Sequence, residues 1–264
     1  MTDLPREGLH DGIDERAYHA DPRSLSSTGA KTLLYRGPRI FQWEREHPVH
    51  KDAFDIGSVV HALILGVGDY EVIDADSWRT KAAKEEQQAA RDAGKAPILR
   101  KDFEAAEAMR DAVMENRLIA SILSEGRPEV SMWATDPETG VLLRGRIDWL
   151  RDNAFVDVKS VAGIIHPQKF ERTVWDLHYH FQAAFYSRIL ALNGITDLPP
   201  LWVAVSKDAP HEALVYQPDD DLLVRADEDV TLAIRQYARC VETGHWPSLT
   251  DDQQIHTISA PRWA

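Results

Sequence analysis

The chain has 264 residues, of which 44% are hydrophobic and 28% are charged, and its formal net charge is -13. That apolar fraction is typical of a globular protein and excludes a disordered chain. The single cysteine, Cys240, excludes a disulfide framework, a four-cysteine zinc site and a cysteine-ligated iron–sulfur cluster. The sequence shows no secretory signal and no apolar run long enough to cross a bilayer. We therefore expect a cytoplasmic protein without a membrane partner.

The negative charge is unevenly distributed along the chain. Residues 23–43 carry four basic side chains and no acidic one, whereas residues 208–252 carry eleven acidic and three basic side chains. A net charge of -13 taken alone argues against nucleic acid, because phosphates attract lysine and arginine. The local basic segment means that the total charge does not exclude a DNA substrate.

The N-terminal half of the sequence is mainly helical by its pattern. Residues 1–22 are polar and are predicted to form a flexible leader, followed by one domain over 23–264. A short strand is predicted at 70–74, and the segment 78–95 predicts an exposed helix or a partly ordered loop. Capping residues, breakers and apolar spacing predict helices at 26–35, 38–46, 57–65 and 101–123.

The apolar pattern changes to a period of two after residue 124. Three strands at 130–135, 141–150 and 155–161 are expected to form an antiparallel meander. The remaining elements are a helix at 178–192, strands at 201–206 and 212–217, a helix at 219–242 and a tail over 243–264. This order predicts an α/β (α+β) protein whose central mixed sheet is flanked by helices, with a helical part over 23–123 and a core over 124–242.

Two carboxylates and one ammonium lie on neighbouring predicted strands. Asp157 and Lys159 are two residues apart, so they share a face of one strand, and Asp148 lies late on the preceding antiparallel strand. Burying like charges together is costly unless a cation neutralises them. Oxygen ligands of this kind suit Mg²⁺, for which Mn²⁺ can substitute. The alternative is that all three side chains are solvated at a sheet edge.

This arrangement resembles the PD-(D/E)XK nuclease superfamily, in which an aspartate precedes an (D/E)-x-K strand. It is most similar to the RecB/RecE-like phage exonucleases (exodeoxyribonuclease VIII-like). That branch has a helical G-x-x-x-H motif upstream, matched by Gly57 and His61, and a Q-x-x-x-Y motif downstream, matched by Gln182 and Tyr186. The segments YHADPRSLSSTGAKTLL and FDIGSVVHALILG also look like the N-terminal region of the RecE type.

The resemblance implies a role for each matched residue, and each has a simpler alternative. It implies that Lys159 assists the attacking water and that Gln182 and Tyr186 contact DNA phosphate or Lys159, although these two could also form a polar stripe beside the core. The simpler alternative for His61 is a hydrogen-bonded core residue, and for Glu129 it is a solvated strand end. The implied metal ligands are His61, Glu129, Asp148, Asp157 and the carbonyl of Val158.

Basic and hydroxyl side chains provide candidate DNA contacts. The resemblance implies that the segment with Arg23, Ser26, Lys31, Arg36 and Arg39 guides a DNA strand, whereas the alternative is a solvated helix face. Arg144 and Arg146 share a strand face and could line a phosphate groove or pair with acidic residues. Trp43 could stack on a base or pack. His178 and His180 are predicted to be surface residues.

The leading hypothesis is a Mg²⁺-dependent DNA exonuclease without an iron–sulfur cluster. The resemblance implies degradation of double-stranded DNA ends in the 5′→3′ direction, a single-strand annealing protein as partner, a ring-shaped homo-oligomer (a tetramer) and a phage or prophage protein in a bacterial host. One alternative is a catalytically silent nuclease fold that binds DNA ends or a protein. Another is a metal-dependent hydrolase of a small phosphoester. No glycine-rich phosphate loop is present, which disfavours a motor ATPase.

Overall fold

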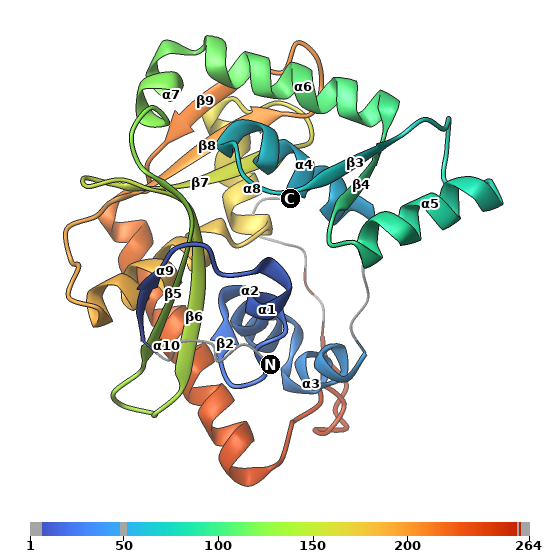
Figure 1. Ribbon diagram of the computed structural model, residues 1–264. Helices are drawn as coiled ribbons and strands as arrows, with labels where there is room; N and C mark the ends of the chain where they lie inside the picture. The colour runs from blue at the N-terminus through green and yellow to red at the C-terminus, as the bar shows by residue number, and fades with distance from the viewer. Residues whose placement is uncertain (1–6, 48–51, 258, 260–264) are drawn as a thin grey trace.

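The protein is described here by a computed structural model that covers residues 7–47, 52–257 and 259 (Figure 1). Its main sheet has the strand order β1-β5-β6-β7-β8-β9, and β2 pairs with β6 outside this path. The strands are β1 (Gly8–His10), β2 (Leu25–Ser26), β5 (Arg127–Thr135), β6 (Leu142–Leu150), β7 (Phe155–Val161), β8 (Pro200–Ser206) and β9 (Ala213–Tyr216). A separate two-stranded parallel sheet joins β3 (Tyr70–Ile73) to β4 (Ala96–Leu99).

Helices cover both faces of the main sheet and make up most of the N-terminal half of the chain (Figure 1). The N-terminal group comprises α1 (Glu15–His19), α2 (Ser27–Lys31), the π-helix η1 (Thr32–Arg36), α3 (Pro38–Glu46), α4 (Asp52–Leu65), α5 (Lys81–Asp92), α6 (Arg100–Glu115) and α7 (Arg117–Ile122). The C-terminal group comprises α8 (Pro167–Asp176), α9 (Tyr179–Leu192) and α10 (Asp220–Thr243). None of the helices in the described ranges is both long and apolar enough to span a membrane.

The predicted fold class is confirmed, because the sheet is mixed and flanked by helices. β5, β6 and β7 form the expected antiparallel meander. The chain then crosses through α8 and α9, and β8 pairs in parallel with β7. A crossover of this kind is what a parallel pair requires, whereas the antiparallel β8–β9 pair needs only a short loop.

The alternation of side chains along β7 separates an apolar face from a polar one. Val156 and Val158 belong to the core cluster that includes residues of α4 and α6. Asp157 and Lys159 lie on the opposite face, where they are paired in register with Trp202 and Ala204 of β8. The charged residues of β7 therefore face the side of the sheet that α8 and α9 cover.

The strands β6 and β7 pair only at one end, which opens the sheet beside Asp148 and Asp157. Their paired positions are Trp149 with Val156 and Leu150 with Phe155, so Asp148 and Asp157 come directly after the last pair. Further along β6, the short strand β2 pairs with Leu143 and Arg144 instead of β7. The two carboxylates thus lie where β6 and β7 separate.

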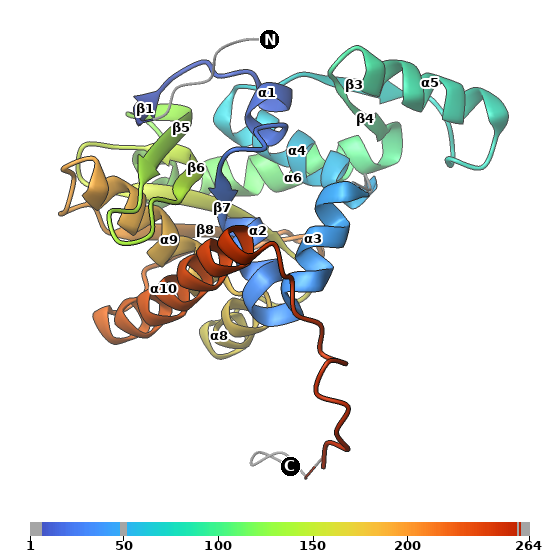
Figure 2. The same ribbon diagram turned by 90° about the horizontal axis from the view of Figure 1, so that it is seen from below.

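The prediction of a flexible leader over residues 1–22 is wrong for residues 7–22. β1 pairs with β5 (Figure 2), α1 is capped by Asp14, and Tyr18 is only 5% exposed. Arg144 holds this segment, since its guanidinium donates to the carbonyls of Asp21, Ser24 and His19 at 2.7, 2.9 and 3.3 Å. A polar composition concealed the order, because the segment is held by long-range contacts to β5 and β6. Residues 1–6 lie outside the described residues.

Other elements differ in detail from the sequence-based expectation. The long helix predicted over 101–123 is two helices, because the Asn116 side chain accepts hydrogen bonds from the backbone N–H of Leu118 and Ile119 and caps α7. The segment 78–95 contains α5, which is capped by Thr80. The helix α8 was not predicted and begins at Pro167, a favourable first residue for a helix.

Candidate active site

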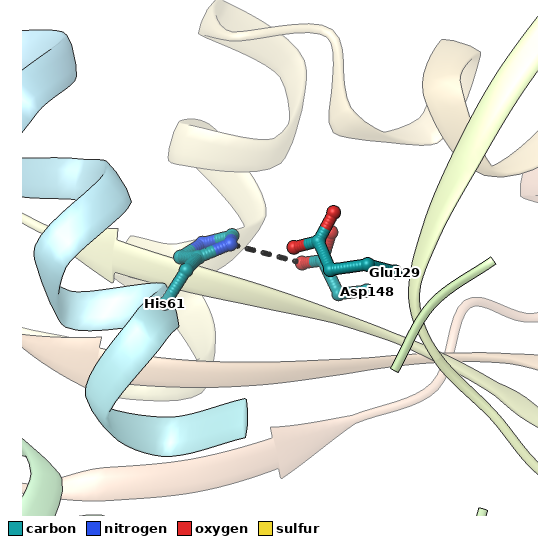
Figure 3. Close-up of side chains that lie close together, drawn as sticks. All are labelled: His61, Glu129 and Asp148. Atoms are coloured by element: carbon teal, nitrogen blue, oxygen red, sulfur yellow. Dashed lines mark ion pairs between the residues drawn. The ribbon is translucent and has the colours of Figure 1, made fainter. Parts of the chain in front are cut away.

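Three potential metal ligands converge at the point where β6 and β7 separate. His61 comes from α4, Glu129 from β5 and Asp148 from β6, and their ligand atoms lie within 4.8 Å of one another. Figure 3 shows the His61 imidazole directed towards the two carboxylates. The His61 Nδ1 atom lies 3.6 Å from an Asp148 carboxylate oxygen. Three of the five predicted ligands are thus brought together.

Glu129 reaches this cluster through an unusual backbone conformation. Its φ angle is 52°, in the left-handed region that residues other than glycine seldom adopt, although it lies within a strand. Burial, followed by the charge of Asp148, raises the pKa of Glu129 to about 7. An Arg146 guanidinium nitrogen 3.7 Å away partly offsets these effects. A cation bound beside such a carboxyl would stabilise its ionised form.

The backbone of β7 links the other two ligands. The Asp148 carboxylate accepts a 2.7 Å hydrogen bond from the N–H of Val158. The carbonyl of the same residue lies 2.9 Å from His61 Nε2. Burial raises the pKa of Asp148, with His61 acting in the opposite direction. The Val158 carbonyl, a predicted ligand, therefore lies beside the cluster and contacts one of its members.

Asp157 and Lys159 form a second group with Gln182 and Tyr186 of α9. Lys159 Nζ lies 2.5 Å from one Asp157 oxygen, and the Gln182 amide nitrogen donates to the other at 2.9 Å. The oxygen of the same amide accepts from Lys159 at 3.1 Å, and its nitrogen also reaches the Tyr186 hydroxyl at 3.3 Å. The predicted contact with Lys159 is therefore made by Gln182, whereas Tyr186 contacts the amide of Gln182.

The Lys159 ammonium is buried but remains charged. Burial alone would lower its pKa, but the Asp157 and Asp148 carboxylates outweigh burial and raise the pKa of Lys159. Its Nζ atom also lies 4.7 Å from the centre of the Tyr179 ring. Sequence reasoning missed Tyr179, which sits three residues before Gln182 on the same helix face and could have been found by that spacing.

Lys31 interacts electrostatically with Lys159 and Asp157. Burial, and then the positive charge of Lys159, lower the pKa of Lys31 to about 8, while Asp157 acts in the opposite direction. The helix α2 that carries Lys31 is capped by the Ser26 side chain, which accepts from the N–H of Gly29. Ser26 therefore has a structural role here, and Lys31 is a predicted DNA contact whose pKa responds to the charges of Lys159 and Asp157.

The predicted arginine contacts have different environments. Arg144 is buried among carbonyls of the N-terminal segment, a position that does not fit a phosphate contact. Arg146 donates to Ser131 Oγ and to the Ile13 carbonyl, besides its pair with Glu129, which matches the alternative of pairing inside the protein. The remaining three lie on α2–α3 or just before: Arg23 pairs with Asp21, Arg36 pairs with Glu44, and Arg39 is exposed.

The prediction that His178 and His180 are surface residues is wrong for His180. His180 is buried, and its Nδ1 lies 3.1 Å from the Val174 carbonyl. His178 is half-buried and stacks on Tyr35 with ring centres 3.6 Å apart. The unpredicted helix α8 covers this end of α9, which is why the alternating pattern misled.

These features define a class of protein. A carboxylate at the end of β6, an Asp-x-Lys strand beside it and a histidine from a preceding helix make this a PD-(D/E)XK-type fold with a candidate metal site. Residues 41–256 match the family model described as a PDDEXK-like domain of unknown function (DUF3799), and the chain belongs to that family. The resemblance inferred from the sequence is confirmed at this level.

Solved structures share the fold at low sequence identity. A candidate exonuclease from Eubacterium rectale superposes with a TM-score of 0.64 at 17% identity, covering 93% of this chain and 92% of that one. LHK-Exo in complex with dAMP matches with a TM-score of 0.29 at 12% identity over 73% and 95% of the two chains. The latter similarity is too low to support an argument. No curated protein matches the chain.

Proposed function

We propose that this protein is a divalent-metal-dependent exonuclease that hydrolyses phosphodiester bonds at double-stranded DNA ends. The observation that carries the proposal is the placement of the His61, Glu129 and Asp148 cluster next to the Asp157–Lys159 pair. Membership of a PDDEXK-like family supports nuclease chemistry. Degradation in the 5′→3′ direction is part of the proposal and follows from the RecE-like motifs.

The chemistry of the ligand set fits a divalent cation. Two acidic side chains, one with a pKa raised to about 7, lie beside an imidazole, and the guanidinium of Arg146, 3.7 Å from Glu129, offsets their charge only in part. Asp157 and the Val158 carbonyl adjoin the cluster and complete the proposed set. Carboxylate and carbonyl oxygens suit Mg²⁺, while an imidazole ligand favours a transition ion such as Mn²⁺. A bound ion would activate water and stabilise charge on the phosphate.

Lys159 is better suited to stabilising charge than to accepting a proton. Its pKa is raised by two carboxylates, so it enters the reaction as an ammonium. Placed beside the scissile phosphate, that ammonium would orient the attacking water and offset negative charge on the phosphoryl oxygens. Gln182 fixes the direction of the Lys159 side chain, because its amide bonds both Lys159 and Asp157. Tyr186 in turn holds the amide of Gln182.

The DNA strand is proposed to approach along α2 and α3. Lys31 lies near Lys159, and Arg39 is exposed on the following helix α3. Arg36 and Arg23 have acidic neighbours but remain near the surface of the same segment. Four basic residues without an acidic one over 23–43 give this segment a local positive charge despite the net charge of -13.

The proposal is tested with purified protein, linear duplex and Mg²⁺ or Mn²⁺. We expect release of nucleotides, and its loss in Asp157→Ala and Lys159→Ala proteins that still fold. The exposed residues Asp152 and Lys169 provide matched controls, since Asp152→Ala and Lys169→Ala remove the same side chains away from the site. Duplexes labelled at one 5′ or one 3′ end report the polarity. Full activity in both site variants, or cleavage of closed circular duplex, would contradict the proposal.

Assembly and partners form a further part of the proposal. We propose a ring-shaped homo-oligomer, a tetramer, that acts with a single-strand annealing protein in a phage-type recombination system. The RecE-like motifs support this arrangement. Mass measurement in solution tests the ring, and a monomer at all working concentrations would refute it. Duplex binding without any cleavage under Mg²⁺ and Mn²⁺ would instead identify a non-catalytic DNA-end-binding protein.

A further inference from the structure

Trp43 on α3 is the most exposed tryptophan in the described part of the chain. Its side chain is 55% exposed, whereas Phe41, two residues earlier, is buried against the core. α3 therefore packs through one face and presents the indole on another. A large aromatic ring left in water retains apolar area that a ligand can cover.

The indole of Trp43 is held in one orientation by His47. The two rings stack with their centres 4.8 Å apart and an angle of 15° between their planes. The His47 ring is itself placed by a 2.9 Å contact between its Nδ1 and the Trp43 carbonyl oxygen. One neighbour thus orients the ring, while more than half of its surface stays accessible.

A cation lies on the same face of α3. Arg39 is exposed and precedes Trp43 by four residues, the spacing that places two side chains side by side on a helix. Within the described ranges, no acidic side chain pairs with the Arg39 guanidinium. The neighbouring arginines are engaged: Arg36 pairs with Glu44 at 2.6 Å, and Arg45 donates to the Pro22 carbonyl at 3.1 Å. Arg39 is therefore available for an anion next to the indole.

We propose that Trp43 and Arg39 bind single-stranded DNA, with an unpaired base stacked on the indole and the adjoining phosphate held by the guanidinium. The inference deepens the proposed nuclease function, on which it rests for the choice of DNA. Stacking requires an accessible base face, which a base inside a duplex does not offer. The helices α2, η1 and α3 are consecutive, so the site lies further along the segment that brings Lys31 to the catalytic group.

Trp175 provides a matched control within the same chain. It is 47% exposed on α8 and also lies beside a histidine ring, that of His180, at 4.3 Å. The position four residues before it holds Glu171, whereas the position four residues before Trp43 holds Arg39. A nonspecific contribution of any exposed indole would make both tryptophans matter, whereas our proposal concerns Trp43 alone.

The experiment measures binding of a fluorescent oligothymidylate of about 20 nucleotides, long enough for several bases to reach the site. The full-length protein is held in EDTA, so that no cleavage occurs. We expect Trp43→Ala to weaken binding about tenfold, because stacking of one base on an aromatic ring contributes about that factor. Trp43→Phe should retain part of the affinity, and Trp175→Ala should bind like the wild type. Unchanged thermal unfolding of Trp43→Ala would show that the fold is intact.

Two further measurements separate the base from the phosphate. An oligomer of abasic sites keeps the phosphates, so wild type and Trp43→Ala should bind it equally. Arg39→Ala should reduce the slope of log K against log salt by about 0.7, the value for one phosphate of a single strand, and Trp43→Ala should leave the slope unchanged. Equal binding of oligothymidylate by wild type and Trp43→Ala would overturn the proposal, and so would a loss that is as large on the abasic oligomer.

Failure of this inference can be told apart from failure of the proposed function. Nucleotide release that depends on Asp157, together with oligothymidylate binding that does not depend on Trp43, would refute the stacking site alone. Binding in EDTA that depends on Trp43, without release under any divalent cation, would refute the nuclease activity and leave the stacking site supported. Failure of the wild type to bind oligothymidylate at all would refute the stacking site directly.

Discussion

Replacing Glu129 by Gln should make the metal-free protein more stable at alkaline pH. The pKa of Glu129 rises from 4.5 to about 7 on folding because of burial and the charge of Asp148. A carboxyl with a raised pKa holds its proton more tightly in the folded state, so its contribution to stability is present below pH 4.5 and is lost as the pH rises towards 7. Glutamine has nearly the same shape and does not ionise, so that loss is removed.

The size of the effect follows from the pKa and the exposure of the side chain. A rise of about 2.5 corresponds to about 3.4 kcal/mol at 1.36 kcal/mol per pKa unit. The Glu129 side chain is 34% exposed, so solvent screening reduces this value. We expect Glu129→Gln to raise the free energy of unfolding by about 1.5 kcal/mol near pH 8 and by almost nothing near pH 4.

Urea unfolding in EDTA at a series of pH values measures this difference, provided that the dependence on urea concentration is the same in both proteins. With millimolar Mn²⁺ near pH 8, the wild type should instead be more stable than Glu129→Gln. Its ionised carboxylate then binds the metal, and bound metal stabilises the native state. A difference that does not change with pH would refute the assigned pKa. If Mn²⁺ raised the free energy of unfolding equally in both proteins, Glu129 would not be a metal ligand.

Three other changes test separate parts of the structure. Gly145→Ala should destabilise the protein by about 1–3 kcal/mol and lower nuclease activity, because the added Cβ would lie 2.5 Å from Met132 and 2.9 Å from the Tyr186 ring; urea unfolding and nucleotide release measure the two effects. Arg144→Met should leave three carbonyls of the N-terminal segment without their donor and make that segment cleavable by protease under native conditions, and resistance equal to the wild type would contradict this. The Mn²⁺ concentration needed for half-maximal nucleotide release should be lower than the Mg²⁺ concentration, because an imidazole ligand favours a transition ion. In His61→Ala the two concentrations should be closer together, as metal titrations of initial rates would show.

The strands that carry the candidate site could be predicted because their chemistry and their pattern agree. Asp157 and Lys159 alternate with buried valines, so the period of two shows at once that this is a strand and that its polar face carries charge. The position of Asp148 beside Asp157 follows from a short connection between antiparallel strands. Gln182 could be placed near Lys159 only through the resemblance, since nothing in a helix sequence states which sheet face it covers.

Contacts between residues that are far apart in the chain could not be predicted from the sequence. Arg144 and Arg146 look like surface cations on an alternating strand, but the N-terminal segment covers them and uses their guanidinium groups. His180 is predicted to be a surface residue because nothing in the sequence around it shows that α8 packs against it. The left-handed backbone of Glu129 also has no local signal, since no glycine or asparagine marks the position.

The pairing of the first strands with the middle of the chain has a consequence for synthesis on the ribosome. Gly8 pairs with Trp133 and Leu25 with Leu143, so each partner is translated more than a hundred residues after the N-terminal residue with which it pairs. Closing such a loop is slow compared with forming local helices, and it cannot begin before β5, for β1, or β6, for β2, has been translated. The strands β1 and β2 therefore remain unpaired while α4 to α7 are translated. A tag or fusion placed there should depress the yield of folded protein more than one placed at the other end.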